Sequence, residues 1–274
     1  MKRIPVIFNH SAAIDDFVST ALLTTMPHID LKGVIVTDAD CITDQGMQMT
    51  WKVHQFLKIT HLVPGLSDAR GWNPFPYLYR ADCERMRRIG VLKNLKDNPS
   101  WPPYPSGEAL FRNLLENCIK NNEPAIVLVT GPFTTLANLL SKDPDLKKGI
   151  SEIVWMGGAI NVKGNLMPKT VPEVIRNRHA EWNAFWDPFA VETMLSMATD
   201  IRIFPLDITN QARLKKSFLA ELKTQSRKYQ LSRFVSQAYK LVEQEKDYEM
   251  WNTLATAYLS RETNLFEEPE NMML

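Results

Sequence analysis

The sequence predicts an α/β protein with an open, mostly parallel sheet that is covered by helices on both faces. Five short apolar runs are each followed by a polar turn or a helical stretch, and this alternation is typical of parallel sheets. The chain has 274 residues, of which 45% are hydrophobic and 23% charged, an ordinary globular composition. We expect a single domain over residues 1–274.

Apolar runs rich in β-branched residues mark the predicted strands. They cover residues 4–8, 33–37, 125–129, 153–156 and 201–204. Helical periodicity follows the first three of these runs, over residues 15–23, 45–57 and 136–140. Each of these helices lies between two strands in the chain, as expected where parallel strands are joined by crossover helices.

Two stretches depart from this alternation. Residues 65–107 lack the periodicity and are rich in Trp and Pro, and we expect them to form an ordered long loop or lid. Residues 215–246 keep a helical pattern in which the many charged residues form the solvated face. A final apolar helix is expected to begin at Trp251.

Charge and cysteine content exclude several classes of protein. The 32 Lys and Arg residues against 31 Asp and Glu give a net charge of +1, which predicts a small-molecule ligand and no nucleic-acid partner. No run approaches the ~20 apolar residues that span a bilayer, so no membrane partner is expected. The N-terminal apolar run is too short for a secretion signal and the three cysteines are widely spaced, which predicts a cytoplasmic protein with free thiols.

Ligands of open parallel sheets bind beyond the carboxyl ends of the strands, so the residues that follow each strand are the functional candidates. Asp15 and Asp16 follow the first strand at the start of a helix. A helix cap and the helix dipole would also explain this pair, whereas its position at a strand end favours a functional role. The Gly-Pro pair at 131–132 and the Gly-Gly pair at 157–158 fit either a connecting turn or the close approach of a ligand.

Four short motifs follow strands or helices in a particular order along the chain. They are Gly-Pro-Phe-Thr-Thr-Leu-Ala at 131–137, Val-Trp-Met-Gly-Gly-Ala at 154–159, Glu-Trp-Asn at 181–183 and Pro-Leu-Asp-Ile-Thr at 205–209. Together they resemble the inosine-uridine preferring nucleoside hydrolases, from residue 4 to about residue 259. The resemblance implies an open α/β sheet with a Rossmann-like core. It also implies hydrolysis of the N-glycosidic bond of ribonucleosides to ribose and free base at a bound calcium ion, and assembly into homodimers or homotetramers.

The same resemblance implies roles for individual residues. Asp16 matches a bidentate calcium ligand, and Thr134 matches the main-chain carbonyl that also binds the ion. Asp15 matches a carboxylate of the catalytic site that binds ribose. Further ribose contacts match Asn165, Glu181 and Asn183, with Trp182 in an aromatic position beside the sugar.

Four positions depart from the family pattern. Ser11 stands where the family has the Asp that both ligates calcium and takes the proton from the attacking water. Asn252 replaces another calcium-binding Asp, and Trp251 replaces a His that assists the leaving base. Asp40 stands where the family has an Asn near the ribose, and an acidic surface loop would explain Asp40 as well as a role in the site does.

These replacements remove two negative charges from the metal site, and calcium affinity falls with the charge of its ligands. Ser is also a poor general base unless a neighbouring group activates it. Two alternatives follow. The chain is a nucleoside hydrolase with impaired or altered activity, or it is a non-catalytic member that binds ribose or a nucleoside or has a structural role.

Overall fold

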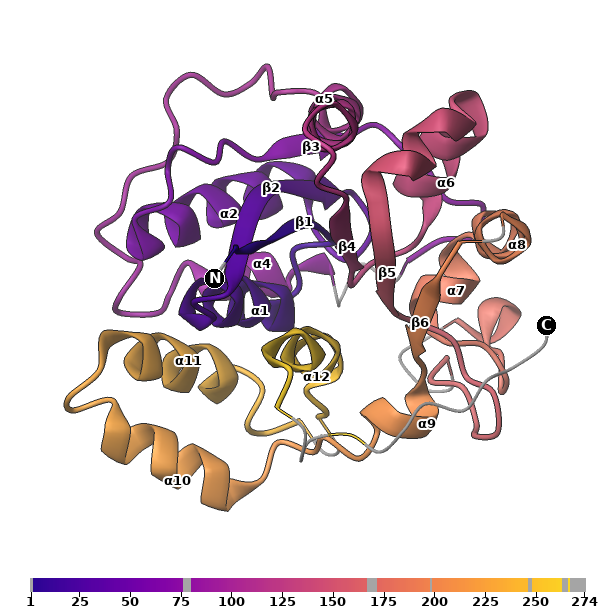
Figure 1. Cartoon of the computed structure of the whole chain (residues 1–274). Coiled ribbons are helices and arrows are strands. Elements are labelled where there is room, and N and C mark those ends of the chain that lie inside the picture. Colours follow the sequence, from indigo (N-terminus) through magenta and orange to yellow (C-terminus); the bar gives the residue numbers. More distant parts are fainter. Residues whose placement is uncertain are drawn as a thin grey trace.

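Six parallel strands form an open sheet at the centre of the described part of the chain (Figure 1). The structure is a computed structural model, and it describes residues 2–75, 80–166, 172–197, 199–245, 248–262 and 266. The strands are β1 (Ile4–His10), β2 (Ile29–Thr37), β3 (Gly65–Ser67), β4 (Ala125–Val129), β5 (Ile150–Met156) and β6 (Ile201–Phe204). Their order across the sheet is β3-β2-β1-β4-β5-β6, which is the Rossmann order. The predicted fold class is confirmed.

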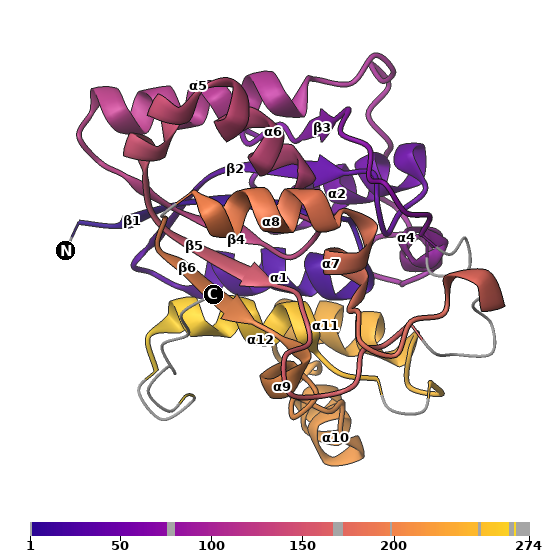
Figure 2. The same ribbon diagram turned by 90° about the vertical axis from the view of Figure 1, so that its right-hand side faces the viewer.

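Helices connect the strands and cover both faces of the sheet (Figure 2). The α-helices are α1 (Ile14–Thr25), α2 (Thr43–Leu57), α4 (Asp82–Met86), α5 (Gly107–Lys120), α6 (Thr134–Lys142), α7 (Trp182–Trp186), α8 (Pro188–Ser196), α9 (Leu206–Thr209), α10 (Lys216–Gln225), α11 (Gln230–Lys240) and α12 (Trp251–Ala257). Short 3-10 helices are η1 (Pro144–Gly149), η2 (Glu173–Ile175) and η3 (Tyr258–Ser260). None of the described helices is long and apolar enough to cross a membrane.

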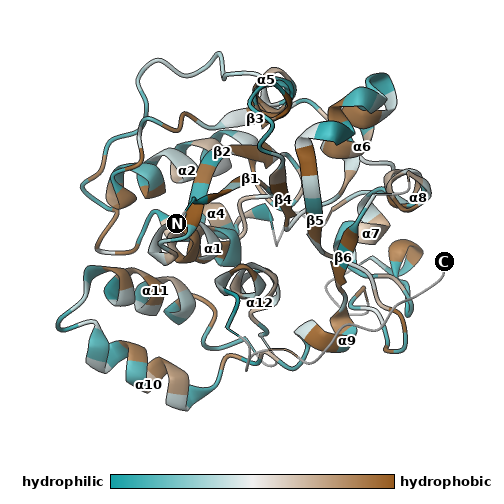
Figure 3. Ribbon diagram, viewed as in Figure 1, coloured by the Kyte–Doolittle hydropathy of each residue, from teal (hydrophilic) through white to brown (hydrophobic). Residues whose placement is uncertain are grey.

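Alternate strand residues face two different hydrophobic clusters. Ile7, Val127 and Trp155 pack with residues of α5, α6 and α8. Phe8 and Val154 point to the other face and pack with residues of α1 and α12. Because both faces are covered, the central strands are apolar along most of their length, and they are brown in Figure 3.

The five predicted strands are all present, and the structure adds β3. This strand has only three residues, pairs with residues 35–37 of β2, and lies at the start of the stretch that was predicted as a long loop or lid. The short helix α4 lies in the same stretch, and residues 76–79 are outside the described residues. A three-residue strand is too short to show an alternating pattern, which explains why periodicity did not predict it.

The helical pattern predicted over residues 215–246 corresponds to two helices, α10 and α11, that pack against each other. The second of them ends at Lys240, and Lys246 lies outside the described residues. The chain turns back between them, as Figure 1 shows. This turn lets Leu222 and Phe234 enter the same hydrophobic cluster, which also contains residues of α1, α2 and α4. The predicted final helix does begin at Trp251, as α12.

The chain changes direction across the sheet between β1 and β4. Strands β1 to β3 proceed toward one edge and β4 to β6 toward the other. At such a point the segments that leave two neighbouring strands diverge, and a crevice opens at their carboxyl ends. Here the N–H of Thr130 donates to the carbonyl of Asn9 at 3.0 Å, so the two segments begin side by side.

Candidate functional site

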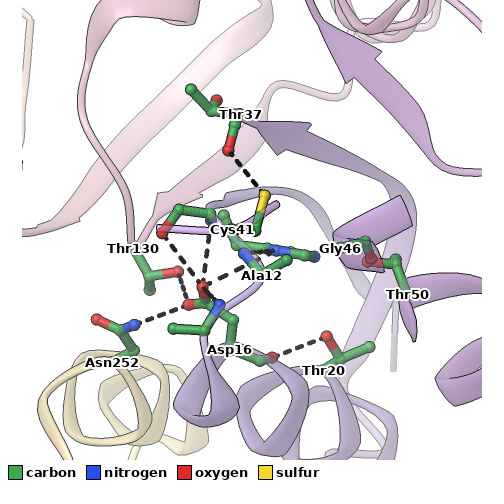
Figure 4. Close-up of polar contacts among 12 residues, drawn as sticks. Ala12, Asp16, Thr20, Thr37, Cys41, Gly46, Thr50, Thr130 and Asn252 are labelled. Atoms are coloured by element: carbon green, nitrogen blue, oxygen red, sulfur yellow. Dashed lines mark hydrogen bonds and ion pairs between the residues drawn. The ribbon is translucent and has the colours of Figure 1, made fainter. Parts of the chain in front are cut away.

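Asp16 lies at the centre of a buried hydrogen-bond network beyond the carboxyl end of β1 (Figure 4). Its Oδ2 accepts from the backbone N–H groups of Ser11 at 3.1 Å and Ala13 at 3.0 Å, and the Ser11 hydroxyl lies 3.5 Å from the same atom. Its Oδ1 accepts from the Thr130 hydroxyl at 2.6 Å and from the Asn252 amide at 2.8 Å. Burial raises the pKa of Asp16 to about 7, although these hydrogen bonds favour the charged form.

The loop before α1 takes its shape from Ala12, whose φ of 60° lies in the left-handed region. This bend directs the N–H groups of Ser11 and Ala13 toward one carboxylate oxygen of Asp16. His10 Nδ1 accepts from the Ala12 N–H at 2.9 Å. Burial lowers the pKa of His10 to about 3, so its imidazole is neutral and its 3.9 Å approach to Asp16 is not an ion pair.

Asp15 caps the N-terminus of α12. Its Oδ2 accepts from the N–H groups of Asn252 at 2.6 Å and Thr253 at 3.0 Å, and its Oδ1 accepts from the hydroxyl groups of Tyr239 at 2.6 Å and Thr253. Burial raises the pKa of Asp15, and the four hydrogen bonds oppose that shift. The carboxylate therefore joins α1 to α11 and α12, and its predicted catalytic and ribose-binding roles stay predictions.

Glu181 caps α7 and also holds the turn after β5. Its Oε1 accepts from the N–H of Asn183 at 2.9 Å, and its Oε2 accepts from those of Gly158 at 2.9 Å and Ala184 at 3.1 Å. Burial raises the pKa of Glu181 to about 7. The Asn183 amide donates to the carbonyl of Met156 at 3.0 Å, so the end of β5 and the start of α7 are held together.

Asn165 and Trp182 belong to the segment between β5 and the end of α7. The N–H of Asn165 donates to the carbonyl of Ala180 at 3.1 Å, which places Asn165 beside the Glu181 cap. The Asn165 Oδ1 is buried and has no hydrogen-bond partner among the described residues. Trp182 is buried against Phe75, with ring centroids 5.0 Å apart. Three of the predicted ribose residues, Asn165, Glu181 and Asn183, thus belong to neighbouring parts of the structure.

Asp40 and Trp251 each carry a buried polar atom that no described residue satisfies. Asp40 Oδ1 and Trp251 Nε1 make no hydrogen bond within the ranges that the structure describes. Burial is the main cause that raises the pKa of Asp40 well above its usual range, with the charges of Asp82 and Asp16 adding to it. The Trp251 ring packs on Tyr248, with centroids 5.2 Å apart. Buried polar atoms are rarely left unsatisfied, and a bound polar molecule would supply the missing partners.

Thr130 and Thr134 both follow β4, and the predicted role of the Thr134 main-chain carbonyl as a calcium ligand stays a prediction, because the contact seen here is made by its hydroxyl. The Thr134 hydroxyl donates to Asp187 at 2.8 Å and joins α6 to α8. The side chain that reaches Asp16 is that of Thr130, which sequence reasoning did not single out. Its position directly after a strand was the available signal.

Tyr239 and Thr253 are two further contacts that sequence reasoning missed. Both donate to Asp15, and Tyr239 is 224 positions away from it in the chain. Thr253 follows the predicted Asn252 directly, so it was a neighbour of a candidate. Tyr239 belonged to a helix predicted only as an amphipathic stretch, and no local pattern marked it.

The donors present do not fit a calcium ion. Calcium is held by about six to eight oxygen atoms, with carboxylates supplying most of the charge. Of the predicted metal residues Ser11, Asp16, Thr134 and Asn252, only Asp16 is a carboxylate, and both of its oxygens already accept hydrogen bonds. Asn252 presents its amide nitrogen to the network, and a nitrogen donor does not ligate a cation. In the part of the chain that the structure describes, no three His, Cys, Asp or Glu side chains form a group that could hold a metal.

Known proteins that are similar to this chain include the following three. A solved inosine-uridine preferring nucleoside hydrolase from Bacillus anthracis superposes with a TM-score of 0.80 at 30% identity, over 95% of this chain and 82% of that one. The non-specific ribonucleoside hydrolase RihC of Escherichia coli O127:H6 is 24% identical over 94% of this chain and 80% of its own length. The pyrimidine-specific ribonucleoside hydrolase RihA of Citrobacter koseri is 25% identical over 77% of this chain, and the match covers only 62% of that relative.

The family model described as inosine-uridine preferring nucleoside hydrolase matches residues 6–273. That range contains every strand from β2 to β6, most of β1, and the networks around Asp15, Asp16 and Glu181. The chain therefore belongs to the inosine-uridine preferring nucleoside hydrolase family.

Proposed function

We propose that this protein binds a ribonucleoside beyond the carboxyl ends of β1, β4 and β5, and that it hydrolyses the N-glycosidic bond only slowly. Two of the relatives described above are named as ribonucleoside hydrolases and the third as an inosine-uridine preferring nucleoside hydrolase, which supports a ribonucleoside as the ligand. The residue types proposed for ribose binding match the family pattern in this chain, whereas those at the positions proposed for catalysis differ from it.

The observation that carries the binding proposal is the buried Oδ1 of Asn165 beside the Glu181 cap, which has no hydrogen-bond partner among the residues that the structure describes. A buried acceptor without a donor is unfavourable, and a ribose hydroxyl is a donor of the right size to satisfy it. Asn183 lies next to Glu181 and is held by the Met156 carbonyl, so this part of the site is ordered before a ligand arrives. A preorganised site loses less entropy on binding.

Trp251 extends the proposed site from the sugar to the base. Its indole N–H is a donor without a partner in the described residues, and every nucleobase offers ring-nitrogen or carbonyl acceptors. A neutral indole N–H can hold a base by a hydrogen bond, but it cannot give up a proton to a leaving group at ordinary pH. This side chain therefore supports binding more strongly than departure of the base.

Slow hydrolysis follows from Ser11 at the position of the expected general base. Its hydroxyl lies 3.5 Å from Asp16, and His10 beside it is neutral and turned to the Ala12 N–H. A positioned general base contributes a factor of about 10²–10⁴ to the rate, and an unactivated Ser does not supply it. The donors around Asp16 do not fit calcium, so the proposal contains no step at a metal ion.

Calorimetric titration of uridine, inosine and ribose into the purified protein tests the binding proposal. We expect all three to bind, and Asn165→Ala to weaken each of them by about tenfold through loss of one hydrogen bond. Asn138→Ala, on the exposed side of α6, is the matched control and should leave binding unchanged. Absence of binding by the wild-type protein would contradict the proposal, and so would a turnover of about 10 per second, which is ordinary for an enzyme.

Two further predictions from the resemblance stay proposals. We propose that the protein assembles into homodimers or homotetramers, which light scattering would measure. We also propose a cytoplasmic location, which fractionation of the source cells would measure.

A further inference from the structure

Asp16 and Asn252 are joined by a direct hydrogen bond where the family resemblance implies a calcium ion between two carboxylates (Figure 4). We propose that this contact, together with the Asp15 cap, replaces the metal, so that α12 docks on the sheet without calcium. The inference deepens the proposed function because it concerns the same site. It assigns Asp15, Asp16 and Asn252 a shared structural role.

Asn252 makes a contact with Asp16 that an Asp at the same position could not make. Its Nδ2 lies 2.8 Å from Asp16 Oδ1, and only the amide nitrogen can donate to that oxygen. Turning the amide over would bring two acceptors together, which is unfavourable in a buried site. An Asp at position 252 could make no such contact, since two carboxylates need a cation or a proton between them. The Asn side chain thus changes a repulsive pair into an attractive one.

The loop before α1 is a second, independent source of donors for the Asp16 carboxylate. The N–H groups of Ser11 and Ala13 both donate to Asp16 Oδ2, an arrangement that compensates a negative charge with backbone dipoles. It depends on Ala12, whose φ is 60°. The left-handed backbone of Ala12 thus lets both N–H groups point at one oxygen of Asp16.

Asp15 attaches the start of α12 to α1 by direct hydrogen bonds. Three of its four hydrogen bonds hold the first turn of α12, through the N–H groups of Asn252 and Thr253 and the Thr253 hydroxyl, and the fourth comes from Tyr239 of α11. The start of α12 is thus attached to α1 by both carboxylates, and each contact runs from a donor to a carboxylate oxygen. No cation is required to balance these contacts, since each carboxylate charge is stabilised by several donors.

Thermal unfolding of the whole chain in EDTA and in excess calcium tests this inference. We expect the wild-type Tm to be the same in both, within ~1 °C, because a ligand stabilises only what it binds. Asn252→Asp should lower the Tm in EDTA by roughly 10 °C, since it places a second buried carboxylate against Asp16. Asn138→Asp, the same substitution on the exposed side of α6, is the matched control and should change little.

The double variant Ser11→Asp with Asn252→Asp restores the expected carboxylates. We expect calcium to raise its Tm, while the wild type shows no change. An increase of the wild-type Tm in calcium by more than ~5 °C would overturn the inference, and so would an Asn252→Asp protein as stable in EDTA as the wild type. A double variant that is indifferent to calcium would overturn the assignment of these positions to the metal site.

A direct calcium titration of the wild-type protein by calorimetry keeps the test independent of how the variants fold. No heat of binding is expected, and tight binding would overturn the inference. The outcomes differ from those of the ribonucleoside titration. Calcium binding would contradict this inference alone, whereas failure to bind uridine, inosine and ribose would contradict the proposed function alone.

Discussion

Replacing Asp15 by Ala is expected to destabilise the folded protein, because its carboxylate accepts four hydrogen bonds in the buried interface between α1 and α12. The N–H groups of Asn252 and Thr253 donate to Oδ2, and they are fixed by the helix backbone. The hydroxyl groups of Tyr239 and Thr253 donate to Oδ1 and also lie 2.8 Å from each other. After the substitution the hydroxyl groups can pair with each other, whereas the two N–H groups stay unsatisfied.

The magnitude follows from those two N–H groups. Each buried unsatisfied donor costs ~1–3 kcal/mol, so we expect the free energy of unfolding to fall by ~4 kcal/mol. In a chain of this size ~1 kcal/mol corresponds to ~2–4 °C, so the Tm should fall by about 8–16 °C. Asp15→Asn should cost only ~1–2 kcal/mol, because its amide oxygen can accept the N–H groups while the hydroxyl groups rotate to accept from its NH₂.

Thermal unfolding followed by circular dichroism measures these differences, and the chain offers a matched pair of controls. Tyr239 and Tyr104 each donate to an aspartate at 2.6 Å, but Tyr239 is buried on Asp15 whereas Tyr104 pairs with the exposed Asp44. We expect Tyr239→Phe to cost ~1 kcal/mol and Tyr104→Phe less than about 0.5 kcal/mol. A Tm of Asp15→Ala within ~2 °C of the wild type would refute the structural role of Asp15.

Three other predictions concern the pH dependence of stability, ligand selectivity and the buried carboxylate of Asp40. The native pKa values of Asp16 and Glu181 are about 7, above the ordinary 3.8 and 4.5, so the native state holds protons that the unfolded state releases. The free energy of unfolding should therefore fall as pH rises from about 4 to about 7, and urea titrations should show Glu181→Gln reducing this fall. Trp251→Phe should weaken uridine and inosine binding by about tenfold while leaving ribose binding unchanged, which calorimetry would show. Asp40→Asn should raise the Tm at neutral pH, because burial disfavours the carboxylate charge that the substitution removes, and a Tm no higher than that of the wild type would contradict this reasoning.

Much of the fold could be predicted because the buried strands are apolar on both faces. β4, with the sequence Ala-Ile-Val-Leu-Val, is buried at every position, and its pattern is visible without any partner. β3 could not be predicted in the same way. It is defined by its pairing with residues 35–37 of β2, far from it in the chain, and not by its own three residues.

The position of the candidate site could be predicted from the sequence, but the contacts within it could not. The rule that ligands lie beyond the carboxyl ends of parallel strands selected Asp15 and Asp16, and these residues are indeed buried there. Their partners depend on how distant helices dock. Tyr239 and Asn252 reach the two carboxylates from α11 and α12, at sequence separations of 224 and 236. No pattern within one segment carries that information.

Calorimetric titration of uridine in EDTA, with the mixture then assayed for free ribose, tests the central claim most directly. The claim is that this chain holds a ribonucleoside in a site assembled without calcium and hydrolyses it slowly. We predict saturable uridine binding that does not change on addition of calcium, with little ribose released during the titration. Uridine binding that appears only with calcium, accompanied by rapid release of ribose, would contradict it.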